Sequence, residues 1–167
     1  STLVKQDYPV DKLEIIIADD RSTDKTWECI TNYSNQFPHF SGIKITEQSK
    51  KMSPKKHALS RAIDLSSGEI IISTDADCFV SKTWISSMVS SFKKSTGIVV
   101  GYSAIDRSQK SFLCHYQALD FLALMSANAG SLGWENAWSG SGQNLAFRRS
   151  AFDMIGGFTP VSNQVSG

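Results

Sequence analysis

The stretches that decide the fold are Glu14-Ile15-Ile16-Ile17-Ala18-Asp19-Asp20 and Glu69-Ile70-Ile71-Ile72-Ser73-Thr74-Asp75-Ala76-Asp77. Each is a run of β-branched residues that ends in a pair of aspartates. A short continuous apolar run is typical of a parallel strand that is covered on both faces. In open α/β sheets, ligands bind at the carboxyl ends of the strands. Both acidic pairs therefore lie where such a fold would bind a ligand.

Segments with alternating strand and helix character surround these two runs. This order implies right-handed crossovers between parallel strands and places the chain in the α/β class. The segment 119–129 is the longest apolar-rich stretch, and it is too short to span a membrane, so we expect a buried or interfacial helix there. Apolar spacing predicts further strands over residues 43–46, 97–102 and 144–147, and helices over 25–35, 55–65, 83–94, 111–129 and 150–155.

The composition indicates one folded domain over residues 1–167. Lys and Arg number 17 and Asp and Glu 16, so the net charge of +1 argues against a protein that binds nucleic acid through bulk positive charge. Cys29, Cys78 and Cys114 are far apart and form no CxxC pair, so we expect reduced, buried thiols in a reducing compartment rather than a disulfide framework. The chain has no P-loop, no GxGxxG fingerprint, and no GxSxG or HExxH motif.

Asp75 and Asp77 form a DxD motif at the end of the second apolar run. Two carboxylates separated by one residue can both reach one divalent cation, and such hard oxygen ligands suit Mg²⁺ or Mn²⁺. The metal would neutralise a phosphate leaving group. The alternative is that these residues only cap the helix that follows.

Asp19 and Asp20 are suited to accepting hydrogen bonds from a base edge or a ribose hydroxyl, although capping of the next helix is an equally good interpretation. Lys55 begins a predicted helix, where its ammonium and the free backbone N–H groups could hold a phosphate or diphosphate. The alternative for Lys55 is an exposed basic face. His57 is expected to pack or to form a hydrogen bond rather than to catalyse.

A loop rich in glycine, serine and tryptophan precedes the last predicted strand. Its small residues, Gly140 among them, allow close approach of the backbone to a ligand. Trp138 could stack on a sugar ring or on an apolar acceptor, or could simply pack within the loop. Arg148 and Arg149 could pair with a phosphate, or could be a solvated strand end.

Five segments in order resemble the family 2 glycosyltransferases, over nearly the whole chain. The resemblance implies the GT-A fold, a Rossmann-like α/β fold of nucleotide-diphospho-sugar transferases with a mostly parallel sheet flanked by helices. The segments that carry it are 14–26, 55–63, 67–77, Gly142-Gln143-Asn144-Leu145-Ala146-Phe147-Arg148 and Ile155-Gly156-Gly157-Phe158.

The resemblance also implies an activity and the roles of individual residues. The enzyme would be an inverting, hexosyltransferase-like glycosyltransferase of polysaccharide biosynthesis, which moves a sugar from a nucleotide-diphosphate sugar to an acceptor hydroxyl with the help of Mg²⁺ or Mn²⁺. The acceptor would be a glycan or a lipid-linked molecule. Asp19, Asp20, Lys55 and Asp75 would bind the donor nucleotide, Asp75 and Asp77 would bind the metal, and Trp138, Gly140 and Asn144 would flank the donor sugar and the acceptor.

Two departures from the family pattern suggest a partial domain. Residues 1–9 resemble the end of the helix that follows the family's first strand, and the family's catalytic acid would come after Gly167. We therefore name no general base and expect this chain alone to be inactive. We expect the protein in the cytoplasm or at the cytoplasmic face of a membrane, with any membrane attachment through segments outside this chain.

Two other functions remain open from the sequence. A nucleotidyltransferase would also use acidic residues and Mg²⁺ to handle a diphosphate, although the glycine-rich phosphate loop that opens such enzymes is not seen here. A binding module without activity, which recognises a sugar or a nucleotide, would fit the absence of an assignable base.

Overall fold

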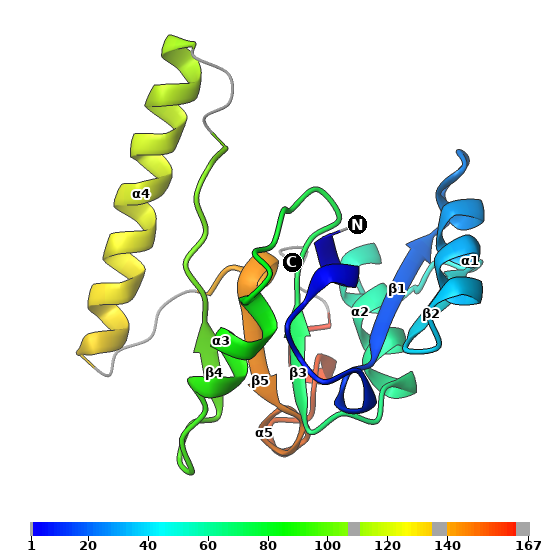
Figure 1. Cartoon of the computed structure of the whole chain (residues 1–167). Helices are drawn as coiled ribbons and strands as arrows, with labels where there is room; N and C mark the ends of the chain where they lie inside the picture. Colours follow the sequence, from blue (N-terminus) through cyan, green and yellow to red (C-terminus); the bar gives the residue numbers. More distant parts are fainter. Residues whose placement is uncertain (1, 107–110, 135–139, 163–167) are drawn as a thin grey trace.

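The computed structural model of the protein describes residues 2–106, 111–134 and 140–162, which form a mixed α/β fold (Figure 1). The helices are α1 (Thr26–Gln36), α2 (Pro54–Leu65), α3 (Trp84–Ser90), α4 (Phe112–Gly133) and α5 (Arg149–Met154), with short 3₁₀ turns η1 (Thr2–Lys5), η2 (Val10–Lys12), η3 (Gly142–Asn144) and η4 (Thr159–Val161). The strands are β1 (Ile15–Asp20), β2 (Phe40–Ile45), β3 (Ile70–Ser73), β4 (Ile98–Val100) and β5 (Leu145–Arg148).

The first sheet pairs β1 with β2 in parallel, from Ile15 opposite Phe40 to Asp20 opposite Ile45. These β-branched and aromatic residues form strands because both sheet faces are covered, by α1 and by α2. The core of this half consists of Ile15, Ile30, Phe40, Ile45 and Ile63, each exposed by less than a tenth. The strand expected at the first apolar run and the helix expected over residues 25–35 are therefore confirmed as β1 and α1.

The second sheet has the order β3-β5-β4, and β5 runs antiparallel to both neighbours. Ala146, in the middle of this sheet, is fully buried. The expected α/β class is confirmed, with the difference that β5 enters its sheet in the opposite direction to β3 and β4. The direction of a strand depends on the path of the chain between elements, so the apolar pattern within β5 could not predict it.

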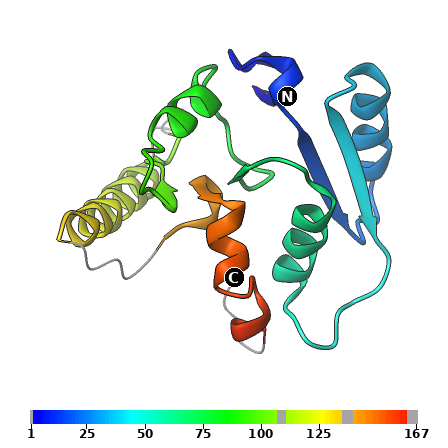
Figure 2. The same ribbon diagram turned by 90° about the horizontal axis from the view of Figure 1, so that it is seen from below.

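The two sheets lie beside each other, and the strands β1 and β3 end on the same side (Figure 1). β1 and β3 run in the same direction, and both end on the same side of the molecule, where α2 begins (Figure 1). In the view from below, the two-stranded sheet and the three-stranded sheet are separate bodies with α2 between them (Figure 2). The segments that carry the acidic pairs therefore lie on the same side of the molecule, although they are more than fifty residues apart in sequence (Figure 1).

The long helix α4 stands apart from the rest of the molecule (Figures 1 and 2). In the segment 119–129, expected to be a buried or interfacial helix, Met125 and Asn128 are buried, whereas Leu119 and Leu124 are more than half exposed, so the helix is not buried throughout. The helix also continues to Gly133, past its expected end at Ala129. In the described ranges, no helix combines the length and the hydropathy that crossing a membrane requires.

All three cysteines are free thiols, as expected. Cys78 and Cys114 are partly exposed and Cys29 is exposed. The expectation that they are buried is therefore wrong. For Cys29 the reason is that it lies on the outward side of α1, whose apolar side is anchored by Ile30.

Candidate functional site

Asp19, at the end of β1, is the most deeply buried large polar side chain of the described structure, at 1% exposure. Its Oδ1 accepts a hydrogen bond from the backbone N–H of Ser22 at 3.1 Å. No hydrogen-bond partner among the described residues reaches its Oδ2, which is also buried. A buried polar atom without a partner is rare in folded proteins, because burial removes its bonds to water. Asp19 therefore keeps one buried carboxylate oxygen without a partner, within the described residues, at the carboxyl end of the strand.

Asp20 and Arg21 form an ion pair at the same strand end. Arg21 Nε donates to Asp20 Oδ1 at 2.8 Å, and this hydrogen bond, with a smaller effect of the carboxylate's charge, raises the pKa of Arg21. The backbone of Arg21 has a φ of 61°, a left-handed conformation that non-glycine residues seldom adopt. Such backbone strain is concentrated at functional sites. The chain therefore turns sharply away directly after the two aspartates.

The start of α2 presents groups that can bind an anion. Ser53 occupies the N-cap position, but its side chain makes no capping hydrogen bond, and its buried Oγ has no partner within the described residues. Pro54 follows at the first position of the helix, where its fixed φ suits helix initiation. The first N–H groups of a helix are unpaired and carry the positive end of the helix dipole. Lys55 adds a full positive charge at this end.

An ion pair joins the start of α2 to the end of β3. Lys55 Nζ lies 2.9 Å from Asp75 Oδ1, and both side chains are more than a third exposed. Thr74, which precedes Asp75, has a buried Oγ1 without a partner in the described part of the chain. Lys56, the next residue of α2, points elsewhere, and its buried Nζ donates to the carbonyl of Val161 at 3.1 Å. We call the ends of β1 and β3, which carry Asp19, Asp20, Asp75 and Asp77, the acidic edge. Of the two lysines, Lys55 is therefore the one at this edge.

The two carboxylates of the DxD motif differ in their surroundings. Asp77 is exposed, and Asp75 is paired with Lys55. Within the described residues, no three His, Cys, Asp or Glu side chains are grouped to hold a metal ion. Mg²⁺ typically uses one or two carboxylates, completing its shell with water and substrate phosphates. Two carboxylates beside an anion-binding helix start are consistent with that donor set.

Asn144, predicted to flank the donor sugar, has a side chain that is engaged within the protein. Its Oδ1 accepts from Trp84 Nε1 at 2.9 Å, and its Nδ2 donates to the carbonyl of Tyr102 at 2.8 Å. A side chain at Gly101 would lie 2.3 Å from Asn144 Oδ1, so only glycine fits beside it. Asn144 thereby connects α3, the segment after β4 and β5.

The other predicted loop residues give less information. Gly140 lies beside Val100 and Leu145, and an added methyl group there would be in ordinary contact at 3.5 Å or more. The fold therefore does not itself require a glycine at this position. Trp138 lies outside the described residues.

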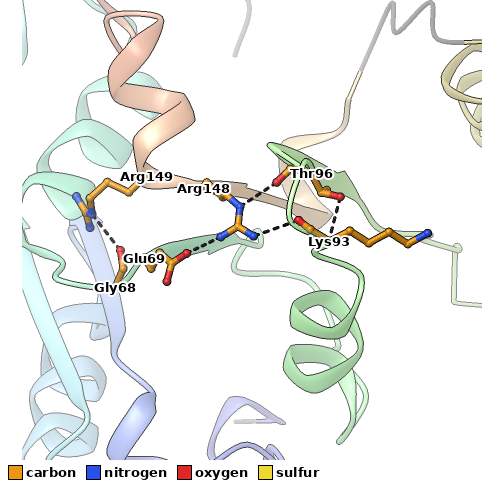
Figure 3. A network of polar contacts seen from close by, with 6 residues as sticks. All are labelled: Gly68, Glu69, Lys93, Thr96, Arg148 and Arg149. Atoms are coloured by element: carbon orange, nitrogen blue, oxygen red, sulfur yellow. Dashed lines mark hydrogen bonds and ion pairs between the residues drawn. The ribbon is translucent and has the colours of Figure 1, made fainter.

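Arg148 and Arg149 both bind backbone carbonyls, so neither of the two interpretations drawn from the sequence is correct (Figure 3). Arg148 donates to the carbonyls of Thr96 at 3.0 Å and Lys93 at 3.2 Å and pairs with Glu69. Arg149 donates to carbonyls around the end of α2. These guanidinium groups are structural and point away from the acidic edge.

The sequence did not reveal the two unpartnered hydroxyl groups, of Ser53 and Thr74. Their positions were nevertheless visible, because Ser53 precedes the proline that starts α2 and Thr74 precedes the DxD motif. What the sequence could not show is that both oxygens are shielded from water without receiving a bond. The site as a whole thus comprises the ends of β1 and β3 and the start of α2.

The family model for glycosyl transferase family 2 matches residues 1–158. The chain is 28% identical over 154 residues to the probable glycosyltransferase YdaM of Bacillus subtilis (strain 168), covering 90% of this chain and 36% of that protein. It is 30% identical over 163 residues to a beta-monoglucosyldiacylglycerol synthase of Synechocystis, covering 93% and 32%. The chain thus spans about a third of the length of these curated relatives.

Solved structures of similar fold agree with the sequence matches. The mannosyltransferase PcManGT of Pyrobaculum calidifontis, solved in complex with GDP-Man and Mn²⁺, is 26% identical with a TM-score of 0.68, covering 93% of this chain and 41% of that one. TarS 1-349 of S. aureus shares the fold at a TM-score of 0.58 and 16% identity, covering 93% and 43%. The GT-A architecture expected from the sequence is therefore confirmed.

Proposed function

The chain belongs to glycosyl transferase family 2, and we propose that it forms the donor-binding part of an enzyme that transfers a sugar from a nucleoside-diphosphate sugar to an acceptor hydroxyl. The observation that carries this proposal is the ion pair between Lys55 Nζ and Asp75 Oδ1 at 2.9 Å. It joins the predicted phosphate-binding cation to the predicted metal-binding carboxylate, from two separate segments of the chain. The similarity to a mannosyltransferase that binds GDP-Man and Mn²⁺ supports the same assignment.

Each part of the acidic edge has a role in holding the donor. Asp19 and Asp20 accept hydrogen bonds from the base or the ribose, and the unpartnered Asp19 Oδ2 supports this role. Lys55 and the first N–H groups of α2 bind the diphosphate, as helix starts bind anions in general. In this arrangement the diphosphate replaces Asp75 as the partner of Lys55, which frees the Asp75 carboxylate.

Asp75 and Asp77 would hold a divalent cation, Mg²⁺ or Mn²⁺. When bound, the cation supplies positive charge that stabilises the departing diphosphate. The positive charge of Lys55 would add to the same stabilisation. The acceptor oxygen attacks the anomeric carbon as the bond to the diphosphate breaks, and a base removes its proton, which gives inversion. We assign that base to no residue of this chain.

The acceptor remains a class rather than a compound. A glycan or a lipid-linked hydroxyl fits the proposal, and the similarity to a beta-monoglucosyldiacylglycerol synthase supports the lipid-linked class. Trp138 and Gly140 stay candidate contacts for the sugar or the acceptor. The side chain of Asn144 would act there mainly by keeping the segment after β4 in place.

Isothermal titration calorimetry tests the donor site directly. We expect GDP or UDP to bind in the presence of Mn²⁺ and to bind at least tenfold more weakly after Asp77→Asn, which removes one metal ligand but preserves the shape of the side chain. Asp153→Asn is the matched control, because Asp153 is an exposed aspartate on α5, away from the acidic edge. The proposal would be contradicted if neither GDP nor UDP bound, or if Asp77→Asn and Asp153→Asn changed the affinity equally.

The same protein also distinguishes the two other functions. Incubation with a nucleoside triphosphate and a sugar phosphate releases pyrophosphate only if the protein is a nucleotidyltransferase. A metal-independent binding module would keep its ligand affinity after Asp77→Asn. A glycosyltransferase should release no pyrophosphate, and its affinity for the nucleoside diphosphate should fall after Asp77→Asn.

A further inference from the structure

The turn between α2 and β3, residues 66–69, is held by an arginine that follows β5, the neighbour of β3 in the second sheet. Arg149 follows β5, and its guanidinium donates to the carbonyls of Ile63 at 3.1 Å and Ser66 at 2.9 Å. It also donates to the carbonyl of Gly68 at 3.0 Å (Figure 3). Its backbone N–H donates to the carbonyl of Glu69 at 2.8 Å. Arg149 therefore bonds four backbone carbonyls between the last turn of α2 and the start of β3.

These contacts suit the end of a helix. The last carbonyls of α2 have no partners within the helix and carry the negative end of its dipole. The planar guanidinium can satisfy several of them at fixed angles, which a lysine ammonium cannot do. Arg149 therefore fixes both the position and the direction of the end of α2.

The same turn is tied to the first sheet. Glu14, which precedes β1, accepts hydrogen bonds from the backbone N–H of Ser67 at 2.8 Å and from its hydroxyl at 3.3 Å. β1 and β3 belong to different sheets among the described strands. The turn is therefore a junction between the two halves of the molecule, and Arg149 bonds three of its four residues, Ser66, Gly68 and Glu69.

The opposite end of α2 carries Lys55, which pairs with Asp75 at the opposite end of β3. α2 has 12 residues, so it is about 18 Å long. A tilt of about 5° at its end would move its start by about 1.5 Å, and displacements of this size strongly affect catalytic sites. The angle between α2 and β3 therefore controls the distance between the diphosphate-binding and metal-binding groups.

We propose that Arg149 is a positioning residue for the donor site: it sets the angle of α2 against β3 and thereby keeps Lys55 in place beside Asp75. This inference rests on the proposed function for its binding readout. Arg149 itself touches no part of the site. Its effect on the donor passes through α2 and reaches the diphosphate through Lys55.

The neighbouring residue Arg148 offers a matched control. It is also a half-buried arginine of the same strand end, and it also bonds two backbone carbonyls and a side chain. Those carbonyls belong to Thr96 and Lys93, between α3 and β4, and its ion pair is with the side chain of Glu69 directly before β3, so none of its bonds is to α2 itself (Figure 3). A loss of binding caused by general destabilisation would appear in both arginine variants.

The test is a double-mutant cycle measured by calorimetry with Mn²⁺ and the nucleoside diphosphate that the protein binds. We expect Arg149→Lys to weaken binding about tenfold and Arg148→Lys by less than twofold. In a Lys55→Met background, Arg149→Lys should cost less than twofold, because the group that it positions is absent. Thermal unfolding of each variant shows whether the two arginine substitutions destabilise the fold to a similar degree.

Three results would overturn the inference. Equal weakening by Arg148→Lys and Arg149→Lys would show a general loss of stability. An unchanged tenfold loss in the Lys55→Met background would show that Arg149 does not act through Lys55. Unchanged binding by Arg149→Lys would show that the angle of α2 does not matter. Failure of the proposed function looks different, because the unmodified protein would then bind neither GDP nor UDP.

Discussion

The two ends of β3 bear polar clusters that differ in one physical respect. At its beginning, the guanidinium groups of Arg148 and Arg149 donate to backbone carbonyls and to side chains of the same molecule (Figure 3). At its end, Thr74 Oγ1 is buried without a partner among the described residues, and Asp19 Oδ2 is in the same state at the end of β1. The first cluster is complete within the chain, and the second is not.

This difference separates structural polar groups from binding groups. Charged and polar groups that are fully bonded contribute to folding, and their loss exposes unpaired partners. Buried polar groups without partners reduce stability, and they persist in active sites because a ligand completes their bonds. Substitutions in the arginine cluster should therefore lower stability, with any effect of Arg149 on binding passing through Lys55, whereas substitutions at the acidic edge should affect mainly ligand binding.

The largest effect should come from Asp75→Asn, on turnover by the complete enzyme to which this chain contributes the donor-binding part, because we expect the chain alone to be inactive. Removing a carboxylate that holds the metal should slow release of the nucleoside diphosphate from a sugar donor by a factor of about 10² to 10³, comparable to losing one group that stabilises a transition state. Folding should change little, because the Lys55–Asp75 ion pair is exposed and such pairs contribute at most about 1 kcal/mol.

A panel of nucleotide sugars with Mn²⁺, assayed for diphosphate release, measures the Asp75→Asn effect, and chemical denaturation gives the stability. Asp153→Asn is again the control. A variant that turns over normally, or one that loses several kcal/mol of stability, would mean that Asp75 is a structural residue like the arginines.

The second effect, on stability, should come from Arg149→Met. The methionine keeps the apolar part of the side chain and leaves the carbonyls of Ile63, Ser66 and Gly68 without this donor. We expect the free energy of unfolding to fall by about 2 kcal/mol, less than for a fully buried network because the site is half-exposed. Urea denaturation followed by circular dichroism measures it. An unchanged midpoint would show that water replaces the guanidinium without cost.

Much of this comparison could be predicted from the sequence at the acidic end and little at the arginine end. The runs Ile15-Ile16-Ile17 and Ile70-Ile71-Ile72 predict buried strands, and the aspartates that follow them predict a ligand edge, because this logic is local to each segment. The pairing of Lys55 with Asp75 follows once both lie at the same edge. Residue types and their spacing along the chain were therefore sufficient to predict the acidic edge.

The arginine network depends on contacts that sequence spacing does not encode. Arg149 binds Ile63 and Gly68, about eighty residues earlier, and this becomes possible only because β5 enters its sheet antiparallel beside β3. The direction of β5 could not be predicted either. In the same way, burial of Asp19 Oδ2 depends on how β1 is covered by its helices, and the sequence shows only that the residue is acidic.

The third effect sharpens the comparison at a single carboxylate. Asp19→Asn keeps the shape of the side chain and removes a buried negative charge whose Oδ2 has no partner in the described structure. We expect stability to stay unchanged or to rise by up to about 1 kcal/mol, while affinity for the nucleoside diphosphate falls about tenfold. Thermal unfolding and calorimetry on the same samples measure both. A clear loss of stability would show that Asp19 is held by bonds within the fold.

The smallest effect concerns Asp24, an exposed carboxylate only five positions after Asp19 that is bonded within the chain. Hydrogen bonds from Thr26, first from its side chain and then from its backbone N–H at 2.9 Å, lower the pKa of Asp24. A pKa that is lower in the folded state than in the unfolded chain means that the charged form stabilises the fold. This stabilisation is complete above about pH 4, the usual pKa of aspartate, and it is lost as the pH falls further. Asp24→Asn keeps an acceptor that does not titrate, so the midpoint of thermal unfolding should fall less for this variant than for the unmodified protein between about pH 5 and pH 3. If the midpoint fell equally in both proteins, the bonds from Thr26 to the Asp24 carboxylate would not contribute to stability. The partnered Asp24 would then be no more important for folding than the unpartnered Asp19.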